Sequence, residues 1–413
     1  MMKQKNFYPM LVLTLCALFL FYKYVLQIFP SVITQELMRE FQLTGTGLGN
    51  LAATFYYTYV VAQLFVGVIL DKYNTRVLTS LAILTCALAL LWFANTESIF
   101  AALFARGLMG IGVAFATVAY LKLAASWFKP QHYAFVSGLL ATAAMAGAVF
   151  GQAPLAYMIA NLSWRPSLSL IGSVGIGFSI LFLIFVRNNP KTLIKNETIH
   201  KITLNEIVQI FKNKQNWLLT LYCGLAFTPI AVFGGLWGNP FLEQAYALSK
   251  TQTASLLSLV FIGLGLGSPV IGFVSDYFGN RRLVMLFTTL ISFLALSAVL
   301  YCTNMPIWLL TIMLFVFGFF IGAFMLAFTI GKETNSPLLT ATVVAMINSC
   351  DALLTAITEP FIGKILDLNW DGKIVAGVHH FQTSSYHMGL SVLPIYLFLA
   401  CILLMWVKET KSE

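Results

Sequence analysis

The fold is decided by a short stretch that occurs twice, LFVGVILDKYNTR at residues 64–76 and GSPVIGFVSDYFGNRR at residues 267–282. In each copy an apolar run reaches a glycine, three more residues and an aspartate, and basic residues follow within six positions. The second aspartate comes 205 residues after the first, which is half of the 413-residue chain. This spacing predicts a chain of two similar halves, as in proteins built from parallel repeats.

The composition identifies the class of protein. Hydrophobic residues make up 59% of the chain and charged residues 9%, with a mean hydropathy of +0.85, whereas soluble domains carry about 25% charged residues. Spanning a bilayer takes about 20 apolar residues. Twelve runs of that order predict an all-α membrane protein, and their continuity excludes a barrel of alternating strands; they cover residues 9–29, 46–70, 77–95, 99–127, 133–160, 167–187, 217–241, 252–274, 283–302, 307–331, 338–364 and 386–407.

The distribution of basic residues predicts the orientation. With the N-terminus in the cytoplasm, sixteen Lys and Arg residues flank the inner ends of the runs and five flank the outer ends, and the positive-inside rule favours this arrangement. Both termini are then cytoplasmic. This distribution of basic residues accounts for the net charge of +9, so the charge does not indicate binding of nucleic acid. The outer five are Arg39, Arg165, Lys250, Lys364 and Lys373; the inner sixteen are Lys3, Lys5, Lys72, Arg76, Lys129, Arg187, Lys191, Lys195, Lys201, Lys212, Lys214, Arg281, Arg282, Lys332, Lys408 and Lys411.

A polar stretch separates two sets of six runs. We therefore predict an N-terminal six-helix bundle at residues 1–187, a cytoplasmic linker at 188–215 and a C-terminal six-helix bundle at 216–413. Within the linker, Leu204, Ile207, Val208 and Phe211 recur at helical spacing, which indicates a short amphipathic helix on the membrane surface. The short loops indicate that one chain works as a monomer among membrane lipids.

The repeated motif resembles that of the major facilitator superfamily, in which Gly-x-x-x-Asp-Arg/Lys-x-Gly-Arg/Lys-Arg/Lys follows the second helix and has an echo in the second half. Asn74 stands where that family prefers glycine. RGLMGIGVAF, residues 106–115, is similar to its fourth-helix motif. The resemblance implies two pseudo-symmetric bundles, alternating access and a multi-pass protein of the bacterial inner membrane. It also implies gating roles for Gly67, Asp71, Lys72, Arg76, Gly272, Asp276, Arg281 and Arg282.

Ionisable residues inside the apolar runs are candidate functional residues, because each costs about 2.5–3.5 kcal/mol to insert. Lys23 and Arg106 lie in the first and fourth runs, which in the resembled family line the central cavity. Two cations there would recognise an anionic group. The alternatives are that Lys23 reaches the interface or pairs with a neighbour, and that Arg106 is structural.

Asp351 lies near the middle of the eleventh run. A buried carboxylate can exchange a proton near neutral pH and so couple transport to a proton gradient. Together with Lys23 it would suit a zwitterion such as an amino acid, whereas the cations alone would suit an organic anion. The alternatives for Asp351 are a buried hydrogen bond or an ion pair with Lys23 or Arg106.

Three polar residues complete the predicted substrate-binding or coupling set. Tyr56 and Gln63 are seven residues apart and share one helical face, and Asn239 lies in the seventh run. Neither a nucleophile–base pair, nor a phosphate loop, nor a metal cluster occurs, so we expect no enzyme and no cofactor. We interpret His379, His380 and His387 as ordinary residues of the last outer loop, with weak metal binding as the alternative.

We therefore predict a secondary transporter that moves a small polar metabolite, an amino acid or an organic anion, by proton-coupled symport. One alternative is a proton-coupled efflux antiporter for drugs or siderophores, which the glycines of the fifth run favour and a cationic cavity opposes. Another is a sensor with the same fold that transports nothing.

Overall fold

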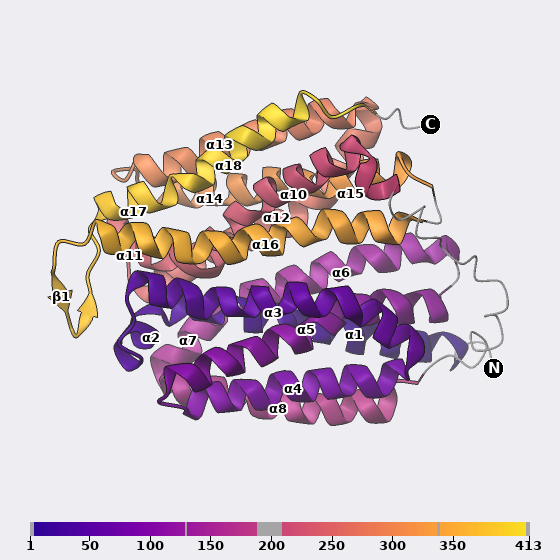
Figure 1. Cartoon of the computed structure of the whole chain (residues 1–413), viewed down its shortest axis with the longest axis horizontal. Coiled ribbons are helices and arrows are strands. Elements are labelled where there is room, and N and C mark those ends of the chain that lie inside the picture. The colour runs from indigo at the N-terminus through magenta and orange to yellow at the C-terminus, as the bar shows by residue number, and fades with distance from the viewer. Residues whose placement is uncertain (1–3, 129, 188–208, 337–338, 410–413) are drawn as a thin grey trace. The chain divides into compact units, whose positions relative to one another are not determined.

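The computed structural model describes residues 4–128, 130–187, 209–336 and 339–409. Helices dominate this part of the chain (Figure 1). Up to residue 187 they are α1 (Gln4–Ile28), η1 (Phe29–Val32), α2 (Thr34–Glu40), α3 (Gly45–Lys72), α4 (Thr75–Asn95), α5 (Ile99–Trp127), α6 (Pro130–Phe150), α7 (Ala153–Leu162) and α8 (Trp164–Phe185).

The second half adds the remaining helices and a two-stranded antiparallel hairpin in which Val375 pairs with Val378. Its elements are α10 (Lys214–Val232), η3 (Phe233–Trp237), α11 (Gly238–Tyr246), α12 (Lys250–Phe278), α13 (Arg281–Tyr301), α14 (Ile307–Ile321), η4 (Gly322–Met325), α15 (Leu326–Glu333), α16 (Thr340–Leu368), β1 (Ile374–Val375), β2 (Val378–His379), α17 (Thr383–Leu390) and α18 (Val392–Leu404).

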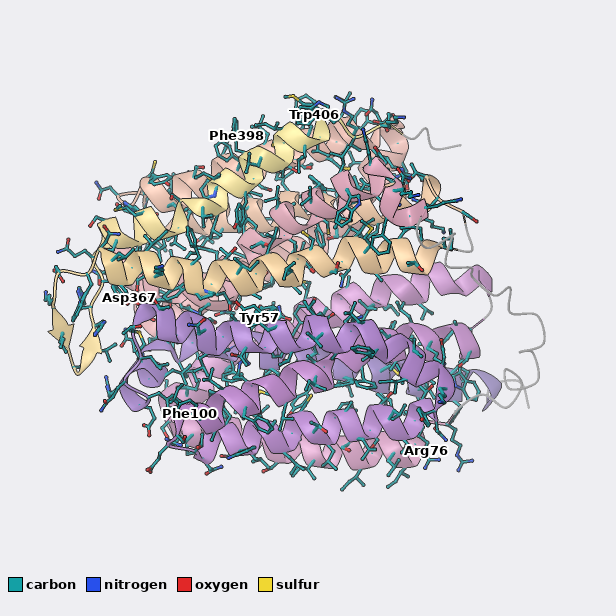
Figure 2. All side chains as sticks on the ribbon, viewed as in Figure 1. Tyr57, Arg76, Phe100, Asp367, Phe398 and Trp406 are labelled. Carbon is teal, nitrogen blue, oxygen red and sulfur yellow. The ribbon has the colours of Figure 1, made fainter. Side chains whose placement is uncertain are left out.

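The predicted fold class is confirmed. Eleven spans of the described chain are long and apolar enough to cross a membrane, and the remaining predicted run, 338–364, overlaps the 29-residue helix α16. Large apolar side chains cover the outside, as a lipid-facing surface requires: Phe100 is 80% and Phe398 52% exposed (Figure 2).

The chain forms two compact units. Unit 1 comprises Met1–Phe29 and Leu51–Ile199, and unit 2 comprises Pro30–Asn50 and His200–Glu413. Unit 2 thus includes residues 30–50, here called the connecting segment, although the helices on either side of it in sequence belong to unit 1. The linker helix predicted within 188–215 lies almost wholly outside the described residues, so the division at 187 and 216 stays a prediction.

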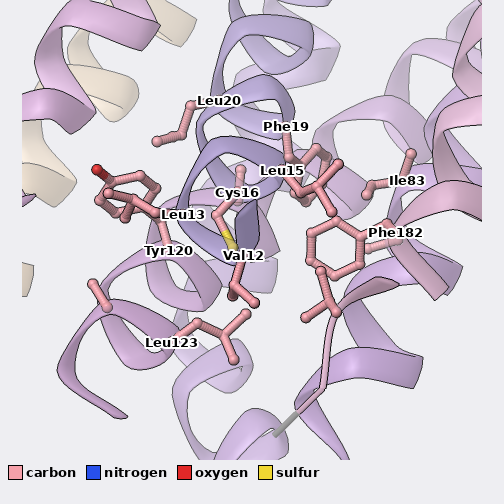
Figure 3. Close-up of a cluster of buried hydrophobic side chains, with 14 of the residues drawn as sticks. Val12, Leu13, Leu15, Cys16, Phe19, Leu20, Ile83, Tyr120, Leu123 and Phe182 are labelled. Atoms are coloured by element: carbon pink, nitrogen blue, oxygen red, sulfur yellow. The ribbon is translucent and has the colours of Figure 1, made fainter. Parts of the chain in front are cut away.

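The core of unit 1 is built around α1. Val12, Cys16 and Phe19 are at most 2% exposed and pack against Ile83 of α4 and Phe182 of α8 (Figure 3). Burial of such side chains contributes about 1.5–3 kcal/mol each where the alternative is water, but within a bilayer close packing matters more.

Glycines bring helices of each unit into backbone contact. A Cβ atom at Gly147 of α6 would lie 2.2 Å from the carbonyl oxygen of Phe21 in α1, and one at Gly318 of α14 would lie 2.0 Å from that of Val260 in α12. Neither position has room for a side chain. Small residues at such crossings are typical of helix packing in membranes.

Three predicted continuous runs are interrupted in the structure. The run at 217–241 contains the π-helical segment η3, the run at 307–331 contains the 3-10 segment η4, and the run at 133–160 breaks between α6 and α7. Pro154 near the start of α7 cannot donate to the preceding turn, and glycine begins or lies within the other two breaks. Such breaks occur frequently at functional sites.

Candidate functional site

Lys23 lies five residues before the end of α1, within the candidate membrane span Tyr8–Val32, and is only 6% exposed. Its Nζ atom donates a hydrogen bond of 3.2 Å to the hydroxyl of Tyr59 on α3. The same nitrogen lies 4.5 Å from the ring centroid of Tyr59 and 5.5 Å from that of Tyr24. Aromatic faces and a hydroxyl stabilise the ammonium group in this buried position.

Arg106 of α5 is fully buried and contacts the backbone of two neighbouring helices. Its NH1 group donates 2.7 Å to the carbonyl oxygen of Leu26, and its NH2 group 3.5 Å to that of Ala52. The guanidinium carbon lies 5.0 Å and 4.8 Å from the ring centroids of Phe29 and Phe55. This geometry joins α1, α3 and α5 near the end of unit 1 from which the connecting segment leaves.

Tyr56 and Gln63 both belong to α3, where Tyr56 is 5% exposed and its ring meets that of Phe55 edge-on at 5.4 Å. The Oε1 atom of Gln63 is buried and has no hydrogen-bond partner within the described parts of the chain. A buried acceptor without a partner costs free energy. Gln63 is therefore a position where a ligand would add a missing bond.

Asp351 and Asn239 belong to unit 2. Asp351 is partly exposed on α16 and follows Cys350, whose sulfur would lie 2.5 Å from a Cβ atom at Gly224 of α10. Asn239 of α11 is 1% exposed and donates 3.2 Å to Ser31 Oγ of the connecting segment. The ion pair of Asp351 with Lys23 or Arg106, one of the alternatives for this residue, is not tested, because those cations belong to unit 1.

The first copy of the motif places its aspartate against a neighbouring helix. Asp71 Oδ1 lies 2.7 Å from Nζ of Lys122 on α5, which also donates to the carbonyl oxygen of Leu70. This pair was not predicted from the sequence, because residues 51 positions apart on different helices leave no periodic signal. Asn74 caps α4 by accepting 3.1 Å from the backbone N–H of Arg76.

The second copy forms a larger charge cluster. Arg281 donates 2.8 Å to Asp276 and makes two bonds, of 3.1 and 2.8 Å, to Glu333 of α15. Glu409 accepts 2.8 and 3.0 Å from the backbone N–H groups of Arg281 and Arg282 at the start of α13, where the helix dipole favours a negative charge. Sequence reasoning missed Glu333 and Glu409, since each becomes adjacent only through folding.

The motif glycines have open surroundings. A Cβ atom added at Gly67 or Gly272 would meet no other residue within 4 Å, although both lie inside long helices. Lys72 places its Nζ atom 5.6 Å from the ring centroid of Tyr73. Packing within this structure therefore does not account for glycine at 67 and 272.

The connecting segment is attached to α16 by a carboxylate and by glycines. Asp367 Oδ1 accepts 2.7 Å from the N–H of Gly45, and Oδ2 accepts 2.7 Å from the N–H of Thr46 (Figure 2 labels Asp367 at this end of α16). A Cβ atom at Gly49 would lie 2.5 Å from the carbonyl oxygen of Glu359. The start of α3 thus packs directly on α16.

The sequence is similar to those of known transport proteins. Residues 11–238 and 224–413 each match the family model described as Major Facilitator Superfamily. The chain is 28% identical to the hexuronate transporter of Bacillus subtilis over 258 residues, which are 60% of each chain. It is 25% identical to the probable L-galactonate transporter of Escherichia coli K12, over 60% of this chain and 57% of that protein.

Two further similarities bear on function and fold. The chain is 21% identical, over 60% of each chain, to the membrane sensor protein UhpC of Salmonella typhimurium. Among solved structures, a bacterial homologue of the human lysosomal transporter Spinster, in an inward-facing and occupied conformation, superposes with a TM-score of 0.79 at 16% identity and covers 97% of both chains. That likeness supports the fold alone.

Proposed function

We propose that this chain, which belongs to the Major Facilitator Superfamily, imports a small organic anion across the bacterial inner membrane together with protons, by alternating access. The buried ammonium group of Lys23 is the observation that carries this proposal. The names of the hexuronate and probable L-galactonate transporters support an anionic sugar derivative as the substrate class. The chain matches these two relatives over about 60% of their length. The substrate class is therefore inferred from the chemistry of the site as well as from the relatives' names.

The position of Lys23 suits recognition of a carboxylate. A charge buried in a membrane protein is costly, and such residues mark substrate or ion pathways. The phenol hydroxyl of Tyr59 fixes the ammonium group at 3.2 Å, and the neighbouring rings contribute apolar surface for the carbon skeleton. An arriving carboxylate would form a charge-assisted hydrogen bond with this nitrogen.

Arg106 serves in this proposal as a positioning residue. Its two backbone contacts join α1 and α3 to α5. Lys23 lies on α1 and Tyr59 lies on α3. A guanidinium group with several fixed donors suits this task better than an ammonium group. Arg106 therefore holds the binding helices in register without touching the substrate.

Proton coupling is assigned to Asp351, a carboxylate inside a helix predicted to span the membrane. The adjacent residue Cys350 packs against Gly224, where α16 meets α10. The charge clusters around Asp71 and Asp276 are proposed as the gates of the two halves, because contacts of this kind can form in one conformation and break in the other.

Uptake into proteoliposomes tests the proposal. Purified protein should accumulate labelled glucuronate or galactonate when the outside is acidic, and a protonophore should abolish the accumulation. Lys23→Met should lower uptake by at least about tenfold, the effect of one lost charge-assisted bond, whereas Lys364→Ala, which removes an exposed lysine of α16, should not. Uptake of neither acid, or uptake unchanged in Lys23→Met, would refute the proposal.

A sensor function is the second candidate, favoured by the similarity to the membrane sensor protein UhpC. It predicts that labelled acid binds the purified protein and that Lys23→Met weakens this binding, while proteoliposomes accumulate nothing. Export of lipophilic cations from preloaded vesicles, unaffected by Lys23→Met, would instead favour the efflux antiporter.

A further inference from the structure

Unit 2 contains a pocket of about 430 Å³ that the proposed transport mechanism does not use. It lies between α2 of the connecting segment, α11 and the β1–β2 hairpin. Its apolar lining includes Trp237, Phe381 and Tyr386, each at most 6% exposed. Its polar lining includes Gln35, Arg39, Glu243, Gln244, His379 and His380. The volume falls within the range of small-molecule sites, about 300–1,000 Å³.

We propose that this pocket is a second binding site for the polyhydroxy carboxylate that the chain takes up, and that binding there contributes to the KM of uptake. The inference rests on the proposed function for the identity of the ligand. The pocket lies at the hairpin end of unit 2, next to α17, and α18 runs from there toward the opposite end of that unit (Figure 1). The predicted orientation places the hairpin end outside the cell.

Arg39 supplies the charge for the carboxylate group. Its Nε–H donates 3.1 Å to the carbonyl oxygen of Ala376 in the hairpin turn. This bond fixes the guanidinium group and uses one of its five N–H donors. The terminal amino groups can then form the two parallel bonds by which arginine holds a carboxylate.

Two histidines supply unused hydrogen-bonding atoms. The Nδ1 atoms of His379 and His380 are buried, and neither has a hydrogen-bond partner within the described residues. The His379 ring is held in place by stacking on Trp370, with ring centroids 3.8 Å apart and planes 10° apart. A hydroxyl group of a ligand can donate to or accept from each of these nitrogens and so offset the cost of leaving them unpaired.

The acidic side chain of the pocket selects for hydroxyl groups. Glu243 accepts 2.8 Å from Gln35 Nε2 through one oxygen, and its other oxygen can accept from a hydroxyl group. Glu243 lines the same pocket as Arg39, so a ligand with one acid group and several hydroxyls is favoured over a dicarboxylate, whose second charge would meet an acidic side chain. The pocket recognises one charge and several hydroxyl groups.

A hydrogen-bonded carboxylate, Asp371, lies in the loop that leads into the hairpin. Asp371 accepts 3.1 Å from the N–H of Lys373 and 2.7 Å from Gln382 Nε2, and these bonds lower the pKa of its carboxyl group below 3.8. The group therefore stays ionised at physiological pH, and the bonds weaken only as the pH falls through the lowered pKa.

Binding and uptake of labelled glucuronate by the full chain test the inference. Arg39→Gln should raise the KM of uptake by about tenfold, as expected for loss of a paired charge, with the maximal rate kept within about twofold. Lys373→Gln is the matched control, since it removes a positive charge from the same hairpin without lining the pocket. A KM changed equally in both variants, or in neither, would overturn the proposal.

Equilibrium dialysis in the Lys23→Met background separates this inference from the proposed function. There labelled glucuronate should still bind, and adding Arg39→Gln or His380→Ala should remove that binding. His387→Ala serves as the control histidine, because it does not line the pocket. If wild-type protein takes up no acid but binds glucuronate in an Arg39-dependent manner, the proposed function fails and the pocket stands. If Lys23→Met alone removes all binding, the pocket proposal fails.

Discussion

Lys122 of α5 and Asp71 of α3 form an ion pair of 2.7 Å at the motif end of unit 1. The side chain of Asp71 is 78% exposed and that of Lys122 34%, so solvent screens the attraction and the pair contributes at most about 1 kcal/mol to stability. A contact of this strength is too weak to determine the fold. It is strong enough to shift an equilibrium between two conformations.

We therefore expect Asp71→Asn to lower uptake by up to about fivefold, the shift that 1 kcal/mol produces, while thermal unfolding in detergent changes little. The exchanged pair, Asp71→Lys with Lys122→Asp, should recover part of the rate. Equal losses in the single variants and the exchanged pair would show that the residues act independently.

Replacement of Gly67 by alanine should separate stability from transport. Because no atom lies within 4 Å of a Cβ at this position, alanine should raise the free energy of unfolding by about 0.4–1 kcal/mol through the unfolded chain. If another conformation brings a second helix against Gly67, uptake should fall in the same variant. Gly272→Ala should behave alike.

Gly110→Ala provides the contrast. A Cβ there would lie 2.2 Å from both the carbonyl oxygen of Phe55 and Oγ1 of Thr58, so this variant should lose about 1–3 kcal/mol of stability. Full transport activity in Gly67→Ala and Gly272→Ala would remove the case for a gating role of either glycine.

The two buried cations of unit 1 should respond differently to substitution. Arg106→Lys retains the charge but cannot reach both Leu26 and Ala52, and we expect it to lose about 1.5–3 kcal/mol of stability. Lys23→Met removes a buried charge and fills the same space, so the stability should hold or rise while uptake is lost. Thermal unfolding and uptake, measured on both variants, distinguish the two roles. If Lys23→Met loses stability and Arg106→Lys loses only uptake, the roles assigned to the two residues are reversed.

Asp367→Ala should loosen the start of α3. The carboxylate accepts hydrogen bonds from the N–H groups of Gly45 and Thr46 and from the Thr46 hydroxyl. Loss of such a helix cap lowers stability by about 0.5–2 kcal/mol. Hydrogen exchange of the peptide that contains residues 45–50 should rise, because its first amides lose their acceptor. Lys364→Ala on the same helix is the control, and equal exchange in both variants would contradict the assignment.

Much of the architecture was predictable because it follows from local composition. Each of the twelve apolar runs overlaps a described helix, and the matched motifs at 67–76 and 272–282 indicated both the duplication and the family. These signals depend on neighbouring residues in the sequence. A bilayer enforces them, since a spanning segment must satisfy its own backbone hydrogen bonds.

The partners of the charged residues were not predictable in the same way. Glu333 and Glu409 reach Arg281 from 52 and 128 positions away, and no periodicity connects such residues. The assignment of residues 30–50 to unit 2 likewise depends on Gly49 and Asp367, whose contacts with α16 and α3 exist only in the folded chain. The proposed substrate and gating roles remain predictions.

The π-helical segment η3, Phe233–Trp237, determines the rotational phase of the helix that follows it. Each residue of an α-helix advances the chain by about 100° around its axis, and a π segment accommodates one residue that regular α-helical winding does not. Removing one residue from η3 would therefore turn Asn239 away from Ser31 and Glu243 away from Gln35 together. These two contacts between α11 and the connecting segment depend on the same rotation of α11 about its axis. A local rewinding of the five residues of η3 is therefore sufficient to break both contacts.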